Sequence, residues 1–255
     1  MKPASFEYFA PQSLSEALRM LDRYQDTARP LAGGQSLVPM MNMRLARPDQ
    51  IIDLNGLREM DYLKIENNEL RIGAMTRQRA LEQSSLVRTA CPLLVEAVQQ
   101  IGHIQIRNRG TVGGSVAHAY PGAELPITML ALEASFVLRS ERHERMVAAR
   151  EFFVDAMSTV LAPGELLTEI RVPKTEAGTG SAFQEISRRY GDFALAAVAG
   201  TITLRPDGTI DRASLVFSGS KPQPANNTDK LIGGRPSRSL FEQIANDAAA
   251  ELEFE

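Results

Sequence analysis

The chain has 255 residues, of which 44% are hydrophobic and 23% are charged. This is the composition of an ordinary globular protein, and it excludes a collagen, a coiled coil and a disordered tail. The formal net charge of −3 gives no basic excess, so nothing indicates a nucleic-acid-binding protein. The one cysteine, Cys91, excludes a disulfide scaffold, a four-cysteine zinc site and an iron–sulfur cluster ligated by this chain alone.

The first part of the chain is predicted to mix short helices and strands. The segment Ser13–Glu16 has the form of a capping box, and apolar residues follow at helical spacing, so we expect a helix over about 13–24. Residues 28–32 are expected to form a short buried strand that runs directly into Gly33–Gly34. The elements predicted next are a strand, a hairpin, a helix and two further strands, over 51–54, 63–72, 93–101, 136–138 and 169–172.

The segment Lys174–Gly180 has the composition of a linker, because it contains Gly and Thr twice each. After it, strand-like patterns flank a turn at Arg205–Gly208, where Pro presets φ and Gly accepts a positive φ. A helix is expected over 240–255. Because strands and helices do not alternate regularly, we expect an α+β fold with a domain boundary near residue 177.

The end of the predicted C-terminal helix carries Glu251, Glu253 and Glu255. Negative charge at a helix C-terminus opposes the helix dipole by about 0.3–1 kcal/mol per charge. This pattern fits a natural chain that tolerates the cost, and it also fits a C-terminal domain that is truncated here.

The sequence offers no targeting or membrane signal. The first residues lack an apolar h-region. The longest apolar run, 193–204, is shorter than the roughly 20 residues that a membrane-spanning helix needs. We therefore expect a cytoplasmic protein without a membrane span.

Several catalytic and cofactor motifs are absent from the sequence. No GxGxxG follows a strand, no Gly-Lys pair forms a phosphate loop, and no HExxH occurs. The three histidines, His103, His118 and His143, show no zinc-ligand spacing. We therefore expect neither a metal site nor a catalytic side chain in this chain.

Two glycine pairs give the main indication of a ligand site. In 31–37 a predicted strand enters the first pair, which is followed by an amide and a hydroxyl side chain; in 111–117 the second pair stands between a threonine and a serine. Glycines let backbone N–H groups approach an anion closely. Hydrogen bonds to charged groups contribute about 1.5–3 kcal/mol each. We expect a diphosphate held by backbone donors of both segments, with ordinary tight turns as the alternative.

The residues around both glycine pairs extend this pattern. The first segment reads Ala-Gly-Gly-Gln-Ser-Leu over 32–37 and continues as Pro-Met-Met-Asn-Met-Arg-Leu over 39–45. The second reads Ile-Gly-His-Ile-Gln-Ile-Arg-Asn-Arg-Gly-Thr-Val-Gly-Gly-Ser over 101–115, followed by Pro121–Pro126. In this order they resemble the two FAD loops of the medium subunit of molybdenum hydroxylases, above all the carbon monoxide dehydrogenase-like branch and more distantly the xanthine dehydrogenase flavin domains. The resemblance extends from residue 1 to about residue 235.

The resemblance implies an α+β fold with a PCMH-type FAD-binding domain over 1–176, built from two α+β subdomains that divide near residue 56. It implies a smaller C-terminal domain over 177–255, with an antiparallel sheet and helices. It also implies non-covalently bound FAD. The residues expected to contact this FAD are Ala32, Gly33, Gly34, Gln35, Ser36, Leu37, Thr111, Gly113, Gly114, Ser115, Ala117, Glu124, Leu167 and Phe193.

The family pattern also implies roles for these residues. The segments 32–36 and 111–115 would wrap the diphosphate and the ribityl chain. Glu124 would accept hydrogen bonds from ribityl hydroxyls, with a solvated loop carboxylate as the alternative. Leu167 would lie beside the flavin ring and Phe193 near the isoalloxazine, with ordinary core positions as the alternatives.

Two further groups of residues have competing interpretations. Arg107 and Arg109 are expected to brace a loop through carbonyl groups rather than to bind an anion. Met40, Met41 and Met43 either fill the core or pack on a partner subunit or the flavin-side wall.

The resemblance implies an FAD-dependent oxidoreductase subunit within a heteromeric molybdenum hydroxylase. A large partner subunit would hold molybdopterin and oxidise the organic substrate, and a small one would hold two [2Fe–2S] clusters. This chain would pass electrons from the clusters through FAD to an external acceptor, in a heterohexamer made as a dimer of heterotrimers. The alternatives are a self-sufficient flavin oxidoreductase of the same fold and an assembly protein without FAD.

Overall fold

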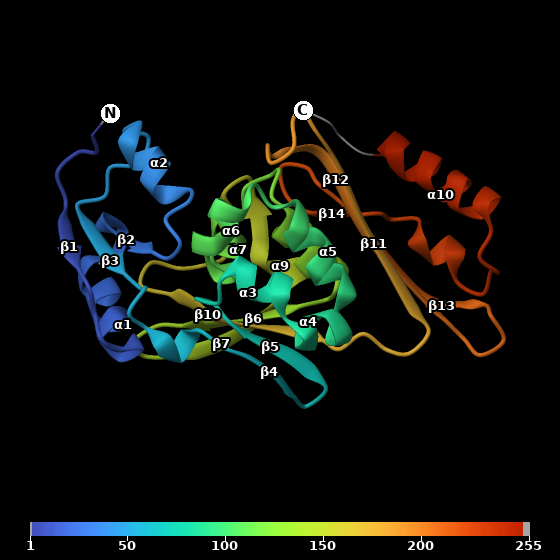
Figure 1. The fold of residues 1–255 in the computed structure, drawn as a ribbon, viewed down its shortest axis with the longest axis horizontal. Helices are drawn as coiled ribbons and strands as arrows, with labels where there is room; N and C mark the ends of the chain where they lie inside the picture. The colour runs from blue at the N-terminus through green and yellow to red at the C-terminus, as the bar shows by residue number, and fades with distance from the viewer. Residues whose placement is uncertain (1, 252–255) are drawn as a thin grey trace.

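The computed structural model describes residues 2–251, in which three larger sheets follow one another along the long axis of the molecule (Figure 1). Each sheet is built from a continuous stretch of the chain, and no strand of one pairs with a strand of another among the described residues. Glu253 and Glu255, whose charges the sequence singled out, lie outside the described residues.

The N-terminal sheet has three parallel strands with helices between them. The order is β1 (Glu7–Phe9), α1 (Leu14–Tyr24), η1 (Gln25–Thr27), β2 (Ala28–Leu31), α2 (Leu37–Asn42) and β3 (Gln50–Asp53). β3 lies in the middle and pairs in parallel with both β1 and β2. The predicted first helix is confirmed, because the Ser13 hydroxyl accepts a hydrogen bond from the Glu16 N–H at 3.2 Å.

Two expectations for this part are wrong. β2 is not a buried strand, because it is an edge strand whose Arg29 and Pro30 are exposed. The strands and helices of 7–53 do alternate as β–α–β–α–β. The alternation was hidden because α2, at six residues, is too short to show helical periodicity.

The middle sheet has five antiparallel strands in the order β4-β5-β10-β6-β7. The predicted hairpin over 63–72 is confirmed, and Asn67 and Asn68 take positive φ values of 53° and 61° at its turn. The strands are β4 (Leu63–Glu66), β5 (Glu69–Gly73), β6 (Ser135–Arg139), β7 (Glu144–Ala148) and β10 (Leu166–Pro173). The short helix η2 (Arg58–Met60) precedes β4. Three short elements lie between β7 and β10: α9 (Ala149–Phe152), β8 (Phe153–Asp155) and β9 (Ser158–Thr159).

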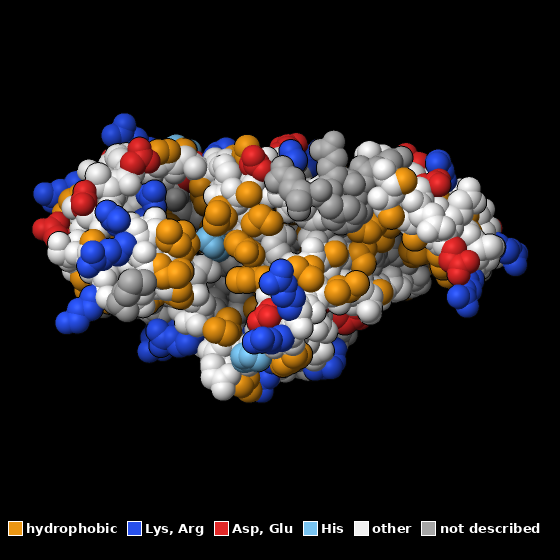
Figure 2. Space-filling view, turned by 90° about the horizontal axis from the view of Figure 1, so that it is seen from above, with side chains coloured by type: hydrophobic (Ala, Val, Ile, Leu, Met, Phe, Trp, Pro, Cys, Tyr) orange, Lys and Arg blue, Asp and Glu red, His pale blue; other side chains and the backbone are white. Residues whose placement is uncertain are grey.

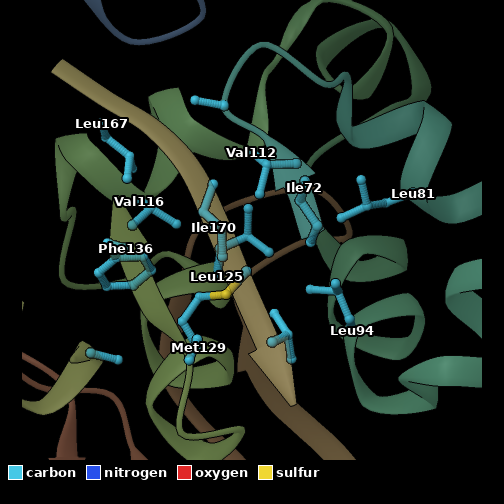
Figure 3. Packing of buried hydrophobic residues seen from close by; sticks show 14 of the residues in the cluster. Ile72, Leu81, Leu94, Val112, Val116, Leu125, Met129, Phe136, Leu167 and Ile170 are labelled. Carbon is cyan, nitrogen blue, oxygen red and sulfur yellow. The ribbon is translucent and has the colours of Figure 1, made fainter. Parts of the chain in front are cut away.

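Six helices connect β5 to β6 and cover one face of this sheet (Figure 1). They are α3 (Gln78–Gln83), α4 (Ser85–Ala90), α5 (Pro92–Gln100), α6 (Ile104–Arg109), α7 (Val112–His118) and α8 (Glu124–Ala131). Val116 of α7 and Leu125 of α8 pack against Phe136 and Ile170 of the strands, in the largest buried apolar cluster (Figure 3). The sheet and this core hold α7 in a fixed position.

The C-terminal sheet has four antiparallel strands, as expected from the family. They are β11 (Thr179–Ser187), β12 (Ala194–Leu204), β13 (Ile210–Phe217) and β14 (Gln223–Pro224), followed by η3 (Thr228–Leu231) and α10 (Arg238–Glu251). One face of the sheet packs against α5 and α8, through Phe183 and Ala199 on Leu93 and Ile127. No helix in the described part of the chain has the length and apolar content needed to cross a membrane.

Candidate functional site

The first glycine pair lies in the turn between β2 and α2. Gly34 has a φ of +74°, which glycine adopts without strain. The backbone N–H groups of residues 33–36 donate to no protein acceptor among the described residues, and Ser36 makes no capping bond to α2. These adjacent N–H groups are therefore available to an anionic ligand.

The second glycine pair does not form a loop, because it lies in the first turn of α7. Thr111 Oγ1 caps this helix by accepting from the Gly114 N–H at 3.1 Å. The N–H groups of residues 112 and 113 donate to carbonyl oxygens just after β5, both at 2.9 Å, and the Ser115 N–H donates to the Thr111 carbonyl. The expectation that both segments offer free backbone donors is therefore wrong for 112–115. The Ser115 hydroxyl, which no other described residue engages, remains available.

The two glycine segments lie against each other. A Cβ on Gly33 would overlap the carbonyl oxygen of Arg109. A Cβ on Gly114 would lie 2.6 Å from Thr111 Oγ1 and 3.4 Å from the Cβ of Ala32. The backbone of Arg109 therefore requires glycine at position 33, and the Thr111 side chain that caps α7 leaves little room for a Cβ at position 114. The sequence had attributed both glycines to the approach of a ligand.

A polar bridge holds this contact together. The Arg77 guanidinium donates to the carbonyl oxygen of Arg109 and, at 2.7 Å, to Asn55 Oδ1. The amide nitrogen of Asn55 in turn donates to the Ala32 carbonyl oxygen at 2.9 Å. One chain of hydrogen bonds thus joins the end of α6 to the first glycine segment.

A cavity of about 390 Å³ opens beside the first glycine segment, at the C-terminal ends of β2 and β3. Residues 31–35 and one side of α2 form its wall, together with the polar side chains of Asn42, Asp53, Asn55 and Arg109. Asn42, Asp53 and Asn55 were not predicted as site residues from the sequence. Asp53 lies within the predicted strand at 51–54 and Asn55 directly follows it, so parallel pairing of that strand with 28–32 would have indicated both residues.

Asp53 is ionised and held in place in this cavity. Its carboxylate accepts hydrogen bonds from the Tyr8 hydroxyl and from the Asn55 backbone N–H, the latter at 2.9 Å. Partial burial alone would raise the pKa of Asp53, but the hydrogen bonds from Tyr8 and Asn55 and the charge of Arg109 hold it below its ordinary value.

Glu124 is not a solvated loop carboxylate. It is 3% exposed, in the first turn of α8, and it does not line the cavity. Burial, with a smaller contribution from Glu185 of β11, raises its pKa to about 8. The side chain is therefore protonated at neutral pH and can donate as well as accept a hydrogen bond.

Leu167 is buried, whereas Phe193 is exposed. Leu167 is buried in the largest apolar cluster (Figure 3). Phe193 is 57% exposed in the β11–β12 turn, which excludes an ordinary core position for it. Its ring lies 4.3 Å from that of Tyr120, which also stacks with His118 at the end of α7. An aromatic surface thus continues from α7 to the C-terminal sheet.

The interpretation of Arg107 as a brace is confirmed. Its guanidinium donates to the carbonyl oxygens of Ile101 and Gly102 at 2.8 and 3.0 Å and pairs with Glu82 at 2.8 Å. Met41 is buried and Met43 is half exposed, so the methionine segment contributes to both the core and the surface. Among the described residues, no group of His, Cys, Asp and Glu could hold a metal ion.

The family comparison covers nearly the whole chain. The family described as "FAD binding domain in molybdopterin dehydrogenase" matches residues 4–175. The family described as "CO dehydrogenase flavoprotein C-terminal domain" matches residues 181–255.

Individual relatives are also similar over the full length of this chain. The chain is 40% identical over 257 residues to the beta subunit of caffeine dehydrogenase from Pseudomonas sp. (strain CBB1), covering all of this chain and 84% of the relative. Its fold matches a chain of carbon monoxide dehydrogenase from Hydrogenophaga pseudoflava with a TM-score of 0.95, at 38% identity and covering 100% of this chain and 90% of that one. It matches a chain of quinoline 2-oxidoreductase from Pseudomonas putida 86 with a TM-score of 0.93, at 32% identity and coverages of 100% and 89%.

Proposed function

Because this chain belongs to the family of FAD-binding medium subunits of molybdenum hydroxylases, we propose that it carries electrons from the [2Fe–2S] clusters of a partner subunit to an external acceptor. The observation that carries this proposal is the full-length match to both the FAD-binding domain and the flavoprotein C-terminal domain.

The residues of the site fit an FAD molecule. The free N–H groups of 33–36 suit the diphosphate. The partly buried ring of Tyr120 and the exposed ring of Phe193 suit a flat ring system. When bound, FAD supplies the redox chemistry, and the protein supplies binding and orientation.

We assign the expected contacts to these surroundings as proposals. The segment Ala32–Leu37 binds the diphosphate with its backbone, and the Ser115 hydroxyl adds a donor from α7. Thr111, Gly113, Gly114 and Ala117 shape the helix that carries Ser115. Glu124, protonated at neutral pH, would hydrogen-bond the ribityl chain through its carboxyl group. Phe193 would lie on the isoalloxazine, with Leu167 as apolar support from the core.

Partners are proposed from the chemistry that this chain lacks. One cysteine cannot ligate a [2Fe–2S] cluster, so the clusters belong to a small subunit and molybdopterin to a large one. The similar chains belong to enzymes that are named for caffeine, carbon monoxide and quinoline. Because similar FAD-binding chains occur with such different substrates, we propose that the large subunit determines the substrate. We propose that the complex is a dimer of such heterotrimers.

We propose that the surface that binds the partner subunits adjoins the exposed ring of Phe193. The β11–β12 end of the C-terminal sheet exposes Ile186, Tyr190, Phe193 and Leu195. Hydrophobic side chains also gather along the middle of the face seen from above (Figure 2). A permanent interface should bury on the order of 2,000 Å² or more and be relatively apolar. The segment of Met40–Met43 is a second proposed contributor.

We also propose the division of the chain into a flavin domain over 1–176, split near residue 56, and a C-terminal domain over 177–255. The separate pairing of the three sheets supports both divisions, since no strand pairs across residue 56 or 177 among the described residues.

The test is tagged expression of this chain from its native host, with flavin, iron and molybdenum analysis of what co-purifies. We expect a large molybdopterin subunit and a small iron–sulfur subunit, and we expect the FAD-loaded chain alone to oxidise no organic substrate. Acid precipitation should release its flavin into the supernatant. Substrate turnover by the isolated chain at the rate of the complex, or no co-purifying partners, would overturn the proposal.

A further inference from the structure

Arg77 is a partly buried arginine that the FAD assignments above do not use. It lies between β5 and α3 and does not line the cavity beside the first glycine segment. Its guanidinium donates to two uncharged oxygen atoms, the carbonyl oxygen of Arg109 and Asn55 Oδ1. Because neither acceptor carries a charge, the position of these donors matters more than the charge of the side chain.

The backbone around Arg77 is fastened to the second glycine segment. Arg77 and Thr111 form an antiparallel bridge. Two backbone hydrogen bonds of 2.9 Å flank this bridge, from the Gln78 N–H to the Gly110 carbonyl oxygen and from the Val112 N–H to the Thr76 carbonyl oxygen. Because 110–112 lead directly into α7, the backbone of Arg77 is held against the helix that presents Ser115.

The side chain of Arg77 reaches the first glycine segment through Asn55. Nη2 donates to Asn55 Oδ1 at 2.7 Å, and Asn55 Nδ2 donates to the Ala32 carbonyl oxygen at 2.9 Å. Nη1 donates to the carbonyl oxygen of Arg109, which is the atom against which the backbone of Gly33 packs. One planar guanidinium therefore holds an acceptor on each side of the contact between the two glycine segments.

The first glycine segment has few other hydrogen bonds that fix its position. The carbonyl oxygens of Gly34 and Ser36 accept from N–H groups of α2, and the carbonyl oxygen of Gly33 accepts from the Gln35 side chain. Among the described residues, the bond from Asn55 to Ala32 is the one that joins this segment to the chain beyond α2. The placement of the Asn55 side chain therefore determines how the segment lies against α6 and α7.

We infer that Arg77 is a positioning residue, which fixes the spacing between the two glycine segments through Asn55 and Arg109 and thereby sets the affinity for FAD. The guanidinium is a rigid planar fork, so its two bonded nitrogens hold their acceptors at a fixed separation. A lysine has one nitrogen on a flexible stem and cannot keep that separation. The inference rests on the proposed function, because it takes FAD as the ligand of both segments.

The test titrates FAD into tagged protein from the native host, purified with its partners and freed of flavin, and follows binding by flavin fluorescence. Arg77→Ala should weaken FAD binding by about tenfold to a hundredfold, as expected for the loss of hydrogen bonds from a charged group. Arg77→Lys should weaken it nearly as much, because it keeps the charge but not the fork. Arg77→Lys also carries the test if Arg77→Ala does not fold.

Arg79→Ala is the matched control, because it makes the same chemical change two residues further along the chain. Arg79 pairs with Glu82 of its own helix, α3, at 2.8 Å. The variant should therefore bind FAD as tightly as the natural protein.

A double-mutant cycle with Asn55→Ala separates positioning from general stability. If Arg77 acts through Asn55, the two changes together should weaken FAD binding by less than the product of their separate factors. A purely structural role would make Arg77→Ala easier to unfold in urea but leave its affinity for FAD unchanged, because a chain that is still almost entirely folded keeps its binding site.

The outcomes distinguish this inference from the proposed function. If the natural protein binds FAD and both Arg77 variants bind it as tightly as Arg79→Ala does, Arg77 has no positioning role while the proposed function stands. Normal binding by Arg77→Lys, or independent effects of Arg77→Ala and Asn55→Ala, would overturn the inference in the same way. If the natural protein does not bind FAD, the proposed function fails and the inference fails with it.

Discussion

Gly33 is a residue at which the fold leaves no room for a side chain. A Cβ there would overlap a backbone carbonyl of Arg109, which cannot turn away as a flexible side chain could. We therefore expect Gly33→Ala to lower the free energy of unfolding by about 1–3 kcal/mol, the usual cost of overpacking. Urea unfolding of the FAD-free chain, followed by circular dichroism, measures this directly.

The matched control for Gly33→Ala is Gly180→Ala. A Cβ at Gly180 in β11 would meet no atom within 4 Å, so the same change should leave stability within about 0.5 kcal/mol of the natural chain. Equal losses in the two variants would show that Gly33 has no special packing role.

Glu124 makes stability depend on pH. Its pKa is raised from 4.5 to about 8 in the folded chain, so around neutral pH the folded state keeps a proton that the unfolded state has released. Its contribution to stability is fully present below about pH 4.5 and is lost as the pH rises towards and through 8. We expect Glu124→Gln, which stays neutral, to flatten the fall in melting temperature between pH 5 and pH 8.

Glu141→Gln provides the comparison, because Glu141 is exposed in the β6–β7 turn. It should leave the slope of melting temperature against pH as in the natural chain. A slope in Glu124→Gln that is as steep as in this control would mean that Glu124 is not the group that releases the proton.

At the scale of elements, α7 depends on the Thr111 cap. The hydroxyl accepts from the Gly114 N–H, and α7 carries Val112 and Val116 into the core. Thr111→Ala should therefore cost about 0.5–2 kcal/mol of unfolding free energy. Because α7 also presents Ser115, the variant should bind FAD more weakly, as measured by flavin fluorescence.

Ser13→Ala removes the corresponding cap from α1, none of whose residues lines the cavity beside the first glycine segment. It should cost a similar free energy of unfolding while leaving FAD affinity unchanged. If both variants lose FAD affinity equally, the effect of Thr111 would be one of general stability.

The elements that could be predicted from the sequence are those specified by neighbouring residues. The capping box defines α1, and Asn67–Asn68 define the turn between β4 and β5. α2 and α7 escaped prediction because they are short, and because α7 contains the glycine pair that normally disfavours a helix. The tertiary bonds from α7 to the chain after β5 offset this preference.

At the scale of the whole molecule, the sequence indicated the two glycine segments but not the cavity between the first of them and β3. Asp53 and Asn42 reach it only because β2 and β3 pair in parallel and α2 folds back beside them. That pairing joins distant residues, so no local pattern shows it. Phe193 likewise reaches Tyr120 only through the docking of the C-terminal sheet on α5 and α8.

The two glycine segments differ in whether their backbone N–H groups have protein partners, and this difference bears on when the chain folds and when it binds its cofactor. The N–H groups of 112–115 already have protein partners, so α7 matures with the core and needs no cofactor to do so. The N–H groups of 33–36 have no protein partner among the described residues, so they hydrogen-bond to water until a ligand binds. We therefore expect the newly made chain to fold before it binds FAD, so that flavin shortage would leave a folded apoprotein that can still take up FAD.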